Sequence, residues 1–240
     1  KGAEKQRYVA GLFARISGRY DLMNDLMTLG MHRGWKRKTA AVAAQGLNGP
    51  AIDVSSGTGD LALALAGRPE IHRAVGLDLL PEMVVKAKEK IQGGGSATPI
   101  TMVTGDALSL PFGDNSFVCA TAGFSLRNMP DVEKALAEMV RVVHPGGRVA
   151  ILELTPMTKG VRSLLFRPLF HGVVPIIGKL VAGNRSAYSY LPQSVDHFMD
   201  ADGLAELLKG LGLSGVQYRR LGFGTVALHW GEKSAANLDR

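Results

Sequence analysis

The sequence predicts an α/β protein with a Rossmann-like, doubly wound, mostly parallel sheet of seven strands, a C-terminal antiparallel hairpin and a helical cap or insertion. Two observations carry this prediction. Short apolar runs alternate with helical stretches between residues 48 and 154, which is the pattern of repeated β-α-β units. Of the 240 residues, 46% are hydrophobic and 30 are glycines, as expected of one domain with a sizeable core and many tight turns.

The first half of the chain provides the first parallel strands. Ala51–Val54 is a short apolar run, and Leu61–Ala66 has the character of the helix that follows it. Ala74–Leu77 is the second strand. Pro81–Ile91 begins with proline and carries charges on one face, which is typical of a surface helix. The stretch Gly93–Ser96 after it is expected to be a flexible surface connection.

The following segments continue the alternation. Ile100–Thr104 and Ser116–Ala122 are the third and fourth strands, and Val132–Val143 is the next helix. Pro145-Gly146-Gly147 is expected to form a turn before the fifth strand, Arg148–Leu154. These strands form the parallel part of the predicted sheet, because each is reached through a helix or a long connection.

The last third of the chain breaks this rhythm. Leu164–Val181 is strongly apolar but contains charged residues and prolines, which argues against a membrane span and favours short helices laid over the sheet. Leu204–Leu211 is expected to be a helix. Val216–Leu221 and Thr225–Trp230 are expected to pair as antiparallel strands around a glycine-containing turn.

Charge and cysteine content limit the classes of function. The formal net charge of +7 fits a protein that binds nucleic acid or an anionic membrane surface. It also fits a protein whose excess positive charge serves only its colloidal stability. No single Lys/Arg run gathers this charge, which weakens the nucleic-acid interpretation. Cys119 is the one cysteine, so an internal disulfide is excluded and a reducing cytoplasm fits. Cys119 is expected to be a small buried hydrophobic residue, and no spacing of histidines suggests a metal site.

The turn after the first strand is the strongest local signal. Gly57-Thr58-Gly59 lets the backbone approach a ligand closely, because glycine has no Cβ. Asp53 and Asp60 flank the turn as an acidic collar, which repels a pyrophosphate and suits a ligand with an ammonium or sulfonium group. Dehydrogenases that use nicotinamide share the loose G-x-G-x-x-A pattern, so the turn alone leaves both ligands open.

Two further carboxylates bear on the choice between a nicotinamide cofactor and a ligand with an ammonium or sulfonium group. Asp78, at the end of the second strand, stands where either cofactor class has a bidentate acceptor for ribose hydroxyls, with helix capping as the alternative. Asp106, after the third strand, can accept from an adenine amino group while the Ala107 backbone N–H reaches a ring nitrogen. With the Pro-Gly-Gly turn, the arrangement over Ala51–Leu154 resembles class I S-adenosylmethionine-dependent methyltransferases. Ser55 departs from it, because many of these enzymes have a glycine there.

A narrower resemblance begins before the sheet. Phe13–Asp25 and Gly30–Lys36 resemble the N-terminal signature of the quinone-biosynthesis C-methyltransferases, which methylate demethylmenaquinol and polyprenyl-benzoquinol rings. Gly123–Asn128 resembles the second signature of that family, with Ser125 where relatives often have glycine. Further matching positions lie between residues 174 and 191 and over Val226–His229, so the resemblance spans nearly the whole chain.

This resemblance implies one methyltransferase domain with S-adenosyl-L-methionine as cofactor and no metal. Its parts are an N-terminal helical lid (1–47), a cofactor-binding core (48–154), a substrate-side helical insertion (155–201) and a closing helix and hairpin (202–232). The residues expected to bind the cofactor are Asp53, Gly57, Thr58, Gly59, Asp60, Asp78, Asp106, Ala107 and Gly123.

The implied reaction is C-methylation of a polyprenyl quinol, with demethylmenaquinol favoured because that activity is the more widespread in the family. Arg127 and Asn128 follow the fourth strand, at the edge where open α/β sheets bind ligands. We expect them to orient a quinol oxygen or a water that takes its proton, with an Arg127–Asp131 ion pair as the alternative. Tyr20, in the lid signature, is expected to bond the substrate or close over the cofactor, with packing as its alternative role.

The polyprenyl tail gives the apolar insertion a purpose, as a channel or a contact with the bilayer in which Arg162, Arg167 and Lys179 face anionic headgroups. A second layer of the core is the alternative. We therefore expect a cytoplasmic protein, peripheral at the inner face of the cell membrane, that binds no nucleic acid. The family also allows a homodimer or a quinone-biosynthesis complex.

Other functions stay open at the level of sequence. One is methylation of a 2-polyprenyl-6-methoxy-1,4-benzoquinol in ubiquinone biosynthesis. Another is a nicotinamide-dependent dehydrogenase, and a third is a non-catalytic subunit that keeps the fold and scaffolds other quinone enzymes. A nucleic-acid methyltransferase is disfavoured, because no Asn/Asp-Pro-Pro-aromatic motif occurs.

Overall fold

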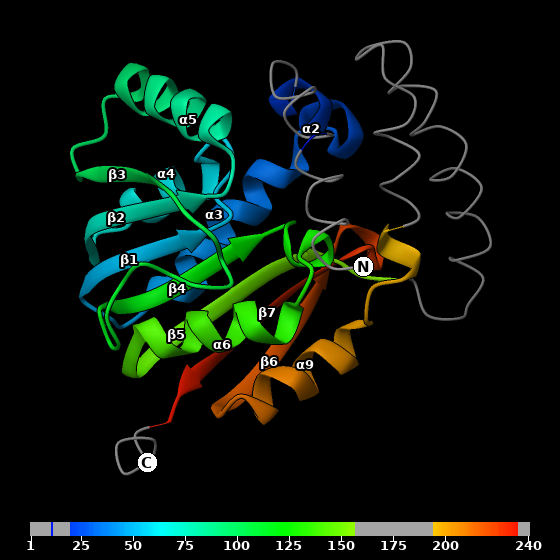
Figure 1. Cartoon of the computed structure of the whole chain (residues 1–240). Helices are drawn as coiled ribbons and strands as arrows, with labels where there is room; N and C mark the ends of the chain where they lie inside the picture. Colours follow the sequence, from blue (N-terminus) through cyan, green and yellow to red (C-terminus); the bar gives the residue numbers. More distant parts are fainter. Residues whose placement is uncertain (1–10, 12–19, 157–193, 235–240) are drawn as a thin grey trace.

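The centre of the molecule is a seven-stranded sheet with the order β3-β2-β1-β4-β5-β7-β6 (Figure 1). It is seen in a computed structural model, which describes residues 11, 20–156 and 194–234. The strands are β1 (Gly49–Val54), β2 (Ile71–Asp78), β3 (Ile100–Thr104), β4 (Phe117–Gly123), β5 (Val143–Leu154), β6 (Leu213–Leu221) and β7 (Val226–Lys233). The described helices are α2 (Tyr20–Thr28), α3 (Met31–Ala44), α4 (Asp60–Ala66), α5 (Pro81–Gly94), α6 (Val132–Val142) and α9 (Ala201–Gly210), with the 3-10 turns η2 (Leu126–Asn128) and η3 (Gly222–Gly224).

The strand directions confirm the predicted fold class. Strands β1 to β5 pair in parallel, whereas β7 runs antiparallel to both β5 and β6. The expected C-terminal hairpin is therefore present, but its second strand lies inside the sheet, between β5 and β6. Because β7 is reversed, β6 again runs parallel to β5, and the carboxyl ends of β1 to β6 all meet one edge of the sheet. We call this edge the carboxyl edge.

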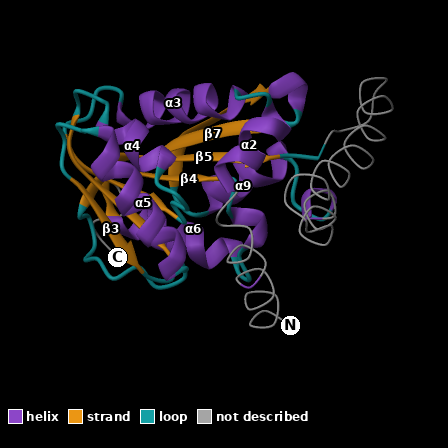
Figure 2. Ribbon diagram, turned by 90° about the horizontal axis from the view of Figure 1, so that it is seen from above, coloured by secondary structure: helices purple, strands orange, loops and turns teal. Residues whose placement is uncertain are grey.

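Helices cover both faces of the sheet, and α2 lies at the carboxyl edge (Figures 1 and 2). Helices α3 and α4 pack on one face through a cluster that includes Ala40, Leu61 and Leu65, and α5 lies against β3 through Ala87 and Met102. Helices α6 and α9 cover the other face with larger side chains. These include Leu136, Met139, Leu204 and Leu208, which pack with Ile52, Leu77 and Ile151.

Cys119 lies in β4, at the centre of the sheet, and is fully buried. Its neighbours are apolar side chains of the α3–α4 face. Burial raises the pKa of its thiol to about 12, so the group stays protonated at neutral pH. The prediction of a small buried hydrophobic residue is confirmed.

Two local predictions were wrong. The loop expected over Gly93–Ser96 is shorter, because α5 continues to Gly94 and ends at Gly95 in the left-handed conformation (φ +60°), a usual helix end. The turn expected at Pro145-Gly146-Gly147 lies inside β5, where it forms an irregularity between the pairs at Phe117 and Cys119. A Cβ on Gly147 would stand 2.5 Å from the Val118 carbonyl oxygen, so only glycine lets the two strands approach here.

Several expectations fall on residues that lie outside the described ranges. They include residues 13–19 of the N-terminal signature, the apolar stretch Leu164–Val181 and the three basic residues Arg162, Arg167 and Lys179. Within the described ranges, no helix combines the length and apolar character needed to cross a membrane. The same ranges bring together no group of three or more His, Cys, Asp or Glu side chains that could hold a metal ion.

Candidate active site

The glycine turn (residues 55–59) follows β1 at the carboxyl edge and leads into α4. Gly57 and Gly59 have φ angles of +56° and +83°, which side chains with a Cβ rarely adopt. A Cβ on Gly59 would also come within 3.1 Å of the Ala87 side chain on α5. Ser55 itself has a φ of +55°, so the residue that departs from the usual glycine keeps the left-handed backbone of the turn.

Asp78 ties the glycine turn to the end of β2. One carboxylate oxygen accepts a 2.8 Å hydrogen bond from the Gly57 backbone N–H, and the other accepts from the Leu80 N–H at 3.0 Å. Burial raises the pKa of Asp78, although these backbone donors oppose the shift. The structure thus places Asp78 against the turn, where a ribose acceptor was predicted, and also bonds it to Leu80, the residue just before α5.

Asp53 does not form a collar that faces a ligand. Its side chain is 1% exposed and points into the protein, where Ser56 donates to it at 2.6 Å and Thr121 donates at 2.9 Å. Burial raises its pKa to about 7, and the two hydroxyl donors only partly offset that effect. Asp53 therefore braces the glycine turn from beneath and joins it to β4.

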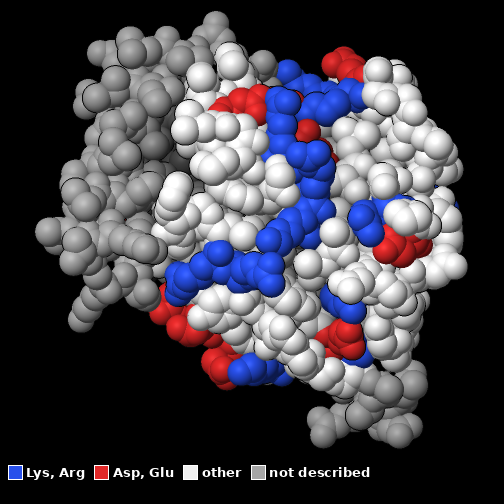
Figure 3. Space-filling model, turned by 180° about the vertical axis from the view of Figure 1, so that it is seen from behind, with Lys and Arg blue, Asp and Glu red and all other residues white. Residues whose placement is uncertain are grey.

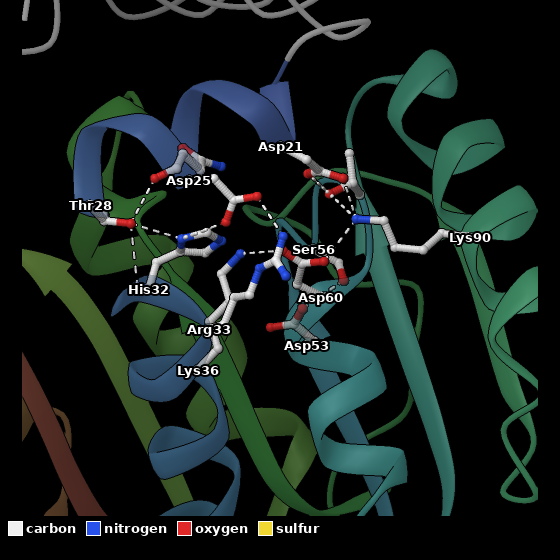
Figure 4. Close-up of polar contacts among 12 residues, drawn as sticks. Asp21, Asp25, Thr28, His32, Arg33, Lys36, Asp53, Ser56, Asp60 and Lys90 are labelled. Carbon is white, nitrogen blue, oxygen red and sulfur yellow. Dashed lines mark hydrogen bonds and ion pairs between the residues drawn. The ribbon is translucent and has the colours of Figure 1, made fainter. Parts of the chain in front are cut away.

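Asp60, the other member of the expected collar, is matched by two ammonium groups. Lys36 of α3 donates to one oxygen at 2.7 Å, and Lys90 of α5 donates to the other at 2.8 Å (Figure 4). Burial disfavours the charged form of Asp60, but the lysines outweigh it and lower the pKa to about 2. The lysines therefore already neutralise the negative charge that the sequence analysis assigned to a ligand. Asp60 lies beside the glycine turn as predicted, but its charge does not select a cationic ligand.

The remaining expected cofactor residues also lie at the carboxyl edge. Asp106 follows β3 and accepts from the Leu108 backbone N–H at 2.9 Å. Ala107 turns its side chain into the core, and Gly123 ends β4. Thr58 donates to Asp21 of α2 at 2.6 Å, so the glycine turn and the N-terminal helix are in direct contact.

Arg127 forms a buried ion pair with Glu153, and not with Asp131. Its Nη1 lies 2.6 Å from Glu153 Oε1 and donates to the Phe124 carbonyl at 2.6 Å. Asp131 instead caps α6 by accepting from the Lys134 backbone N–H. The pair joins the carboxyl ends of the neighbouring strands β4 and β5, with both side chains under 10% exposed.

Three polar side-chain atoms beside this pair are buried without a hydrogen-bond partner among the described residues. They are Ser125 Oγ, Asn128 Oδ1 and Thr155 Oγ1, from the segments that follow β4 and β5. Buried polar groups are normally satisfied, because leaving one unpaired costs about 1–3 kcal/mol. Such a cluster at the carboxyl edge of an α/β sheet is typical of a site that binds a polar ligand.

Tyr20 is the first residue of α2, at the same edge, and the structure describes only its backbone position. Elsewhere, a groove of about 740 Å³ lies on the opposite side of the molecule from the view of Figure 1, between α3 and the strands β6 and β7. Lys38, Arg148 and Arg219 line it, and Lys and Arg side chains form a band across that face (Figure 3). This groove is separate from the carboxyl edge.

Sequence reasoning missed Lys36, Lys90 and Glu153. Glu153 had a usable signal, because an acidic residue in the apolar run Ile151–Leu154 needs a buried partner. The lysines had no signal for a contact with Asp60, although Lys36 ends the signature stretch Gly30–Lys36. Each lysine meets Asp60 only when its own helix folds onto the glycine turn.

The order of the sheet, its reversed β7 and the glycine turn bound to Asp78 define a class I methyltransferase. A solved structure of a SAM-dependent methyltransferase from Thermotoga maritima superimposes with a TM-score of 0.65 over 94% of this chain and 99% of that one. The two sequences are 16% identical, so this likeness concerns the fold.

The chain belongs to the ubiE/COQ5 methyltransferase family, whose family model matches residues 1–233. It is 41% identical over 230 residues to a demethylmenaquinone methyltransferase of Deinococcus radiodurans, covering 96% of this chain and 94% of the relative. It is 37% identical to a ubiquinone/menaquinone biosynthesis C-methyltransferase of Paracoccus denitrificans, covering 96% and 92%. The protein is therefore an enzyme of the S-adenosylmethionine-dependent methyltransferase class, and the dehydrogenase interpretation is wrong.

Proposed function

We propose that this enzyme transfers a methyl group to a ring carbon of a polyprenyl quinol, with demethylmenaquinol as the substrate. The main support for a substrate site is the set of buried polar side chains Ser125, Asn128 and Thr155 beside the Arg127–Glu153 pair. It offers polar groups for quinol oxygens at the same edge as the glycine turn. The names of the relatives in Deinococcus and Paracoccus support the choice of a quinone precursor.

The residues of the glycine turn fit S-adenosylmethionine. Gly57 and Gly59 leave the backbone open to a ligand, and Asp78 and Asp106 supply carboxylate acceptors at the ends of β2 and β3. When bound, this cofactor supplies an electrophilic methyl group on a sulfonium sulfur. Carboxylates suit its ribose hydroxyls and its amino groups.

The polar groups after β4 and β5 would prepare the quinol for methylation. Loss of the phenolic proton raises electron density on the neighbouring ring carbon. The guanidinium of Arg127 stabilises the developing phenolate, because a positive charge fixed by Glu153 and the Phe124 carbonyl needs no reorganisation. Asn128 orients the quinol oxygen or a water that accepts its proton.

A direct assay tests the substrate. The purified protein is incubated with labelled S-adenosylmethionine and, in parallel, with short-chain demethylmenaquinol and with the 2-polyprenyl-6-methoxy-1,4-benzoquinol. We expect label in the naphthoquinol product at a kcat/KM at least about tenfold above that for the benzoquinol. A preference for the benzoquinol would move the enzyme to ubiquinone biosynthesis. Cofactor binding without methylation of either ring would favour the scaffold subunit.

We also propose that the carboxyl edge touches the membrane that holds the substrate. Leu22 and Leu26 of α2, Leu29 after it and Phe223 of η3 are exposed apolar side chains at this edge, with Leu29 at 85% and Phe223 at 79% exposure. An apolar surface next to the polar cluster suits a substrate with a long isoprenoid tail. A homodimer, a quinone-biosynthesis complex and a cytoplasmic location stay predictions.

A further inference from the structure

An ion network joins α2 to the glycine turn. Lys90 of α5 is its centre: its ammonium donates to Asp60 at 2.8 Å, to Thr58 at 3.1 Å and, in a short contact, to Asp21 of α2. Asp21 also accepts from Thr58, and Lys36 of α3 completes the network at Asp60. Figure 4 shows α2 above the ends of the strands, with Asp21 directed down toward Lys90.

The network differs from an ordinary surface ion pair in two ways. Its side chains come from four helices and the glycine turn, and most of them are largely shielded: Lys36 is 12% exposed, Asp60 25% and Lys90 30%. Shielded, multiply bonded charges interact more strongly than exposed pairs, which contribute little. Asp21 is the most accessible member, at 40% exposure. The bond to α2 is therefore the part of the network that can open first.

The charges balance within the network. Asp21 and Asp60 face Lys36 and Lys90, so two carboxylates meet two ammonium groups. Burial opposes the charge on Lys90, but Asp21 and Asp60 outweigh it and raise its pKa above the usual value. The low pKa of Asp60 likewise keeps that group ionised. Salt, rather than pH, is the variable that should loosen this network near neutrality.

We propose that Asp21 and Lys90 form a latch that holds α2 against Thr58 of the glycine turn and Asp60 at the start of α4, and so governs the exchange of S-adenosylmethionine and its product. The inference rests on the proposed cofactor site. With the latch closed, the turn is fixed by Asp53 from below, by Asp78 from the side and by Asp21 from above. With it open, α2 no longer restrains Thr58. Lys90 and Asp21 are thus positioning residues that act on the cofactor through the turn.

The test measures dissociation of S-adenosylhomocysteine by stopped flow at 50 and 500 mM NaCl. We expect the wild-type rate to rise about fivefold with salt, because screening weakens the latch. Lys90→Met keeps an unbranched side chain only one atom shorter and removes its charge. It should release the ligand about tenfold faster at low salt and lose most of the salt dependence. Asp21→Asn, which retains a polar bond to Thr58, should have a smaller effect in the same direction.

The matched control is Lys88→Met, at an exposed lysine two positions away on α5. It should leave both rates unchanged. The double variant Asp21→Asn/Lys90→Met should dissociate no faster than Lys90→Met alone, because both substitutions break the same bond. Equal rates in the Lys90 and Lys88 variants, or additive effects in the double variant, would overturn the latch. Failure of the wild type to bind S-adenosylhomocysteine would instead remove the proposed cofactor site, and the latch with it.

Discussion

At the scale of single residues, each buried carboxylate of the candidate site is held by its own set of hydrogen-bond donors. Asp53 bonds two hydroxyls, Asp78 bonds two backbone N–H groups, and Glu153 bonds a guanidinium. Burial raises the pKa of both Asp53 and Asp78, and the hydrogen-bond donors of each carboxylate oppose that shift. The sequence predicted where two of these carboxylates lie but not what they contact.

Replacement of Arg127 should affect turnover more than cofactor binding. We expect Arg127→Ala to lower kcat about 100-fold, as for loss of one donor to a developing oxyanion. The dissociation constant of S-adenosylhomocysteine should change less than about threefold. Because Ala leaves Glu153 buried without its partner, Arg127→Lys serves as the second variant. It keeps a charge near Glu153 and should recover stability more fully than turnover. Parallel losses of binding and turnover in both variants would contradict the proposed role.

Asp53 should make the stability of the wild type fall as the pH rises. Its pKa of about 7 in the folded protein lies above the ordinary value near 3.8, so the folded state holds the proton more tightly between those two pH values. Stability contributed by that proton is present below about pH 4 and is lost as the pH approaches and passes about 7.

The matching variant is Asp53→Asn, whose amide can accept from Thr121 and donate to Ser56. Thermal unfolding of both proteins is measured at pH 5, 6, 7 and 8. The Tm of the variant minus that of the wild type should increase by about 3 °C or more from pH 5 to pH 8, since one pKa unit corresponds to about 1.4 kcal/mol. Parallel curves for the two proteins would show that Asp53 ionises normally.

At the scale of elements, the sheet depends on backbone conformations that few residue types can adopt. The glycine turn and the irregularity in β5 both contain left-handed residues, but only the former lies beside α4 and α5. A Cβ on Gly59, just before α4, would stand 3.1 Å from Ala87 Cβ, closer than an ordinary van der Waals contact, whereas a Cβ on Gly146 would meet nothing within 4 Å.

These two glycines make a matched pair. Gly59→Ala and Gly146→Ala each impose a left-handed alanine, which should cost roughly 1–2 kcal/mol of unfolding free energy. Only Gly59→Ala should also weaken binding of S-adenosylhomocysteine, by about tenfold or more, because it alters the turn itself. Calorimetric titration and chemical denaturation measure the two effects. A similar loss of binding in both variants would mean that stability alone is responsible.

At the scale of the whole molecule, the carboxyl edge combines the polar site with exposed apolar side chains, and a basic band lies on another face. Leu29 follows α2, which lies at this edge, and Phe223 comes nearly 200 residues later, directly after β6. Phe223 reaches the same edge because β6 runs parallel to β5. These exposed apolar side chains favour membrane contact through the edge itself rather than through the basic band.

Flotation with vesicles that contain anionic phospholipid tests this orientation. The wild type should float, and Leu29→Glu or Phe223→Glu should each reduce the bound fraction at least about threefold. Gln92→Glu, at an exposed position of α5, adds the same charge and should float like the wild type. Equal flotation of all four proteins, or none by the wild type, would contradict contact through this edge.

The sequence by itself determined the α/β class, the parallel strands, the buried Cys119 and the position of the glycine turn after β1. It could do so because apolar runs, glycines and strand ends are local signals. Only the tertiary structure decided the insertion of β7 beside β5, the partner of Arg127 and the neutralisation of Asp60 by two lysines. These depend on segments far apart in sequence that meet when the sheet forms. Which residues lie at the site was therefore largely readable from the chain, whereas their charges and contacts were set by folding.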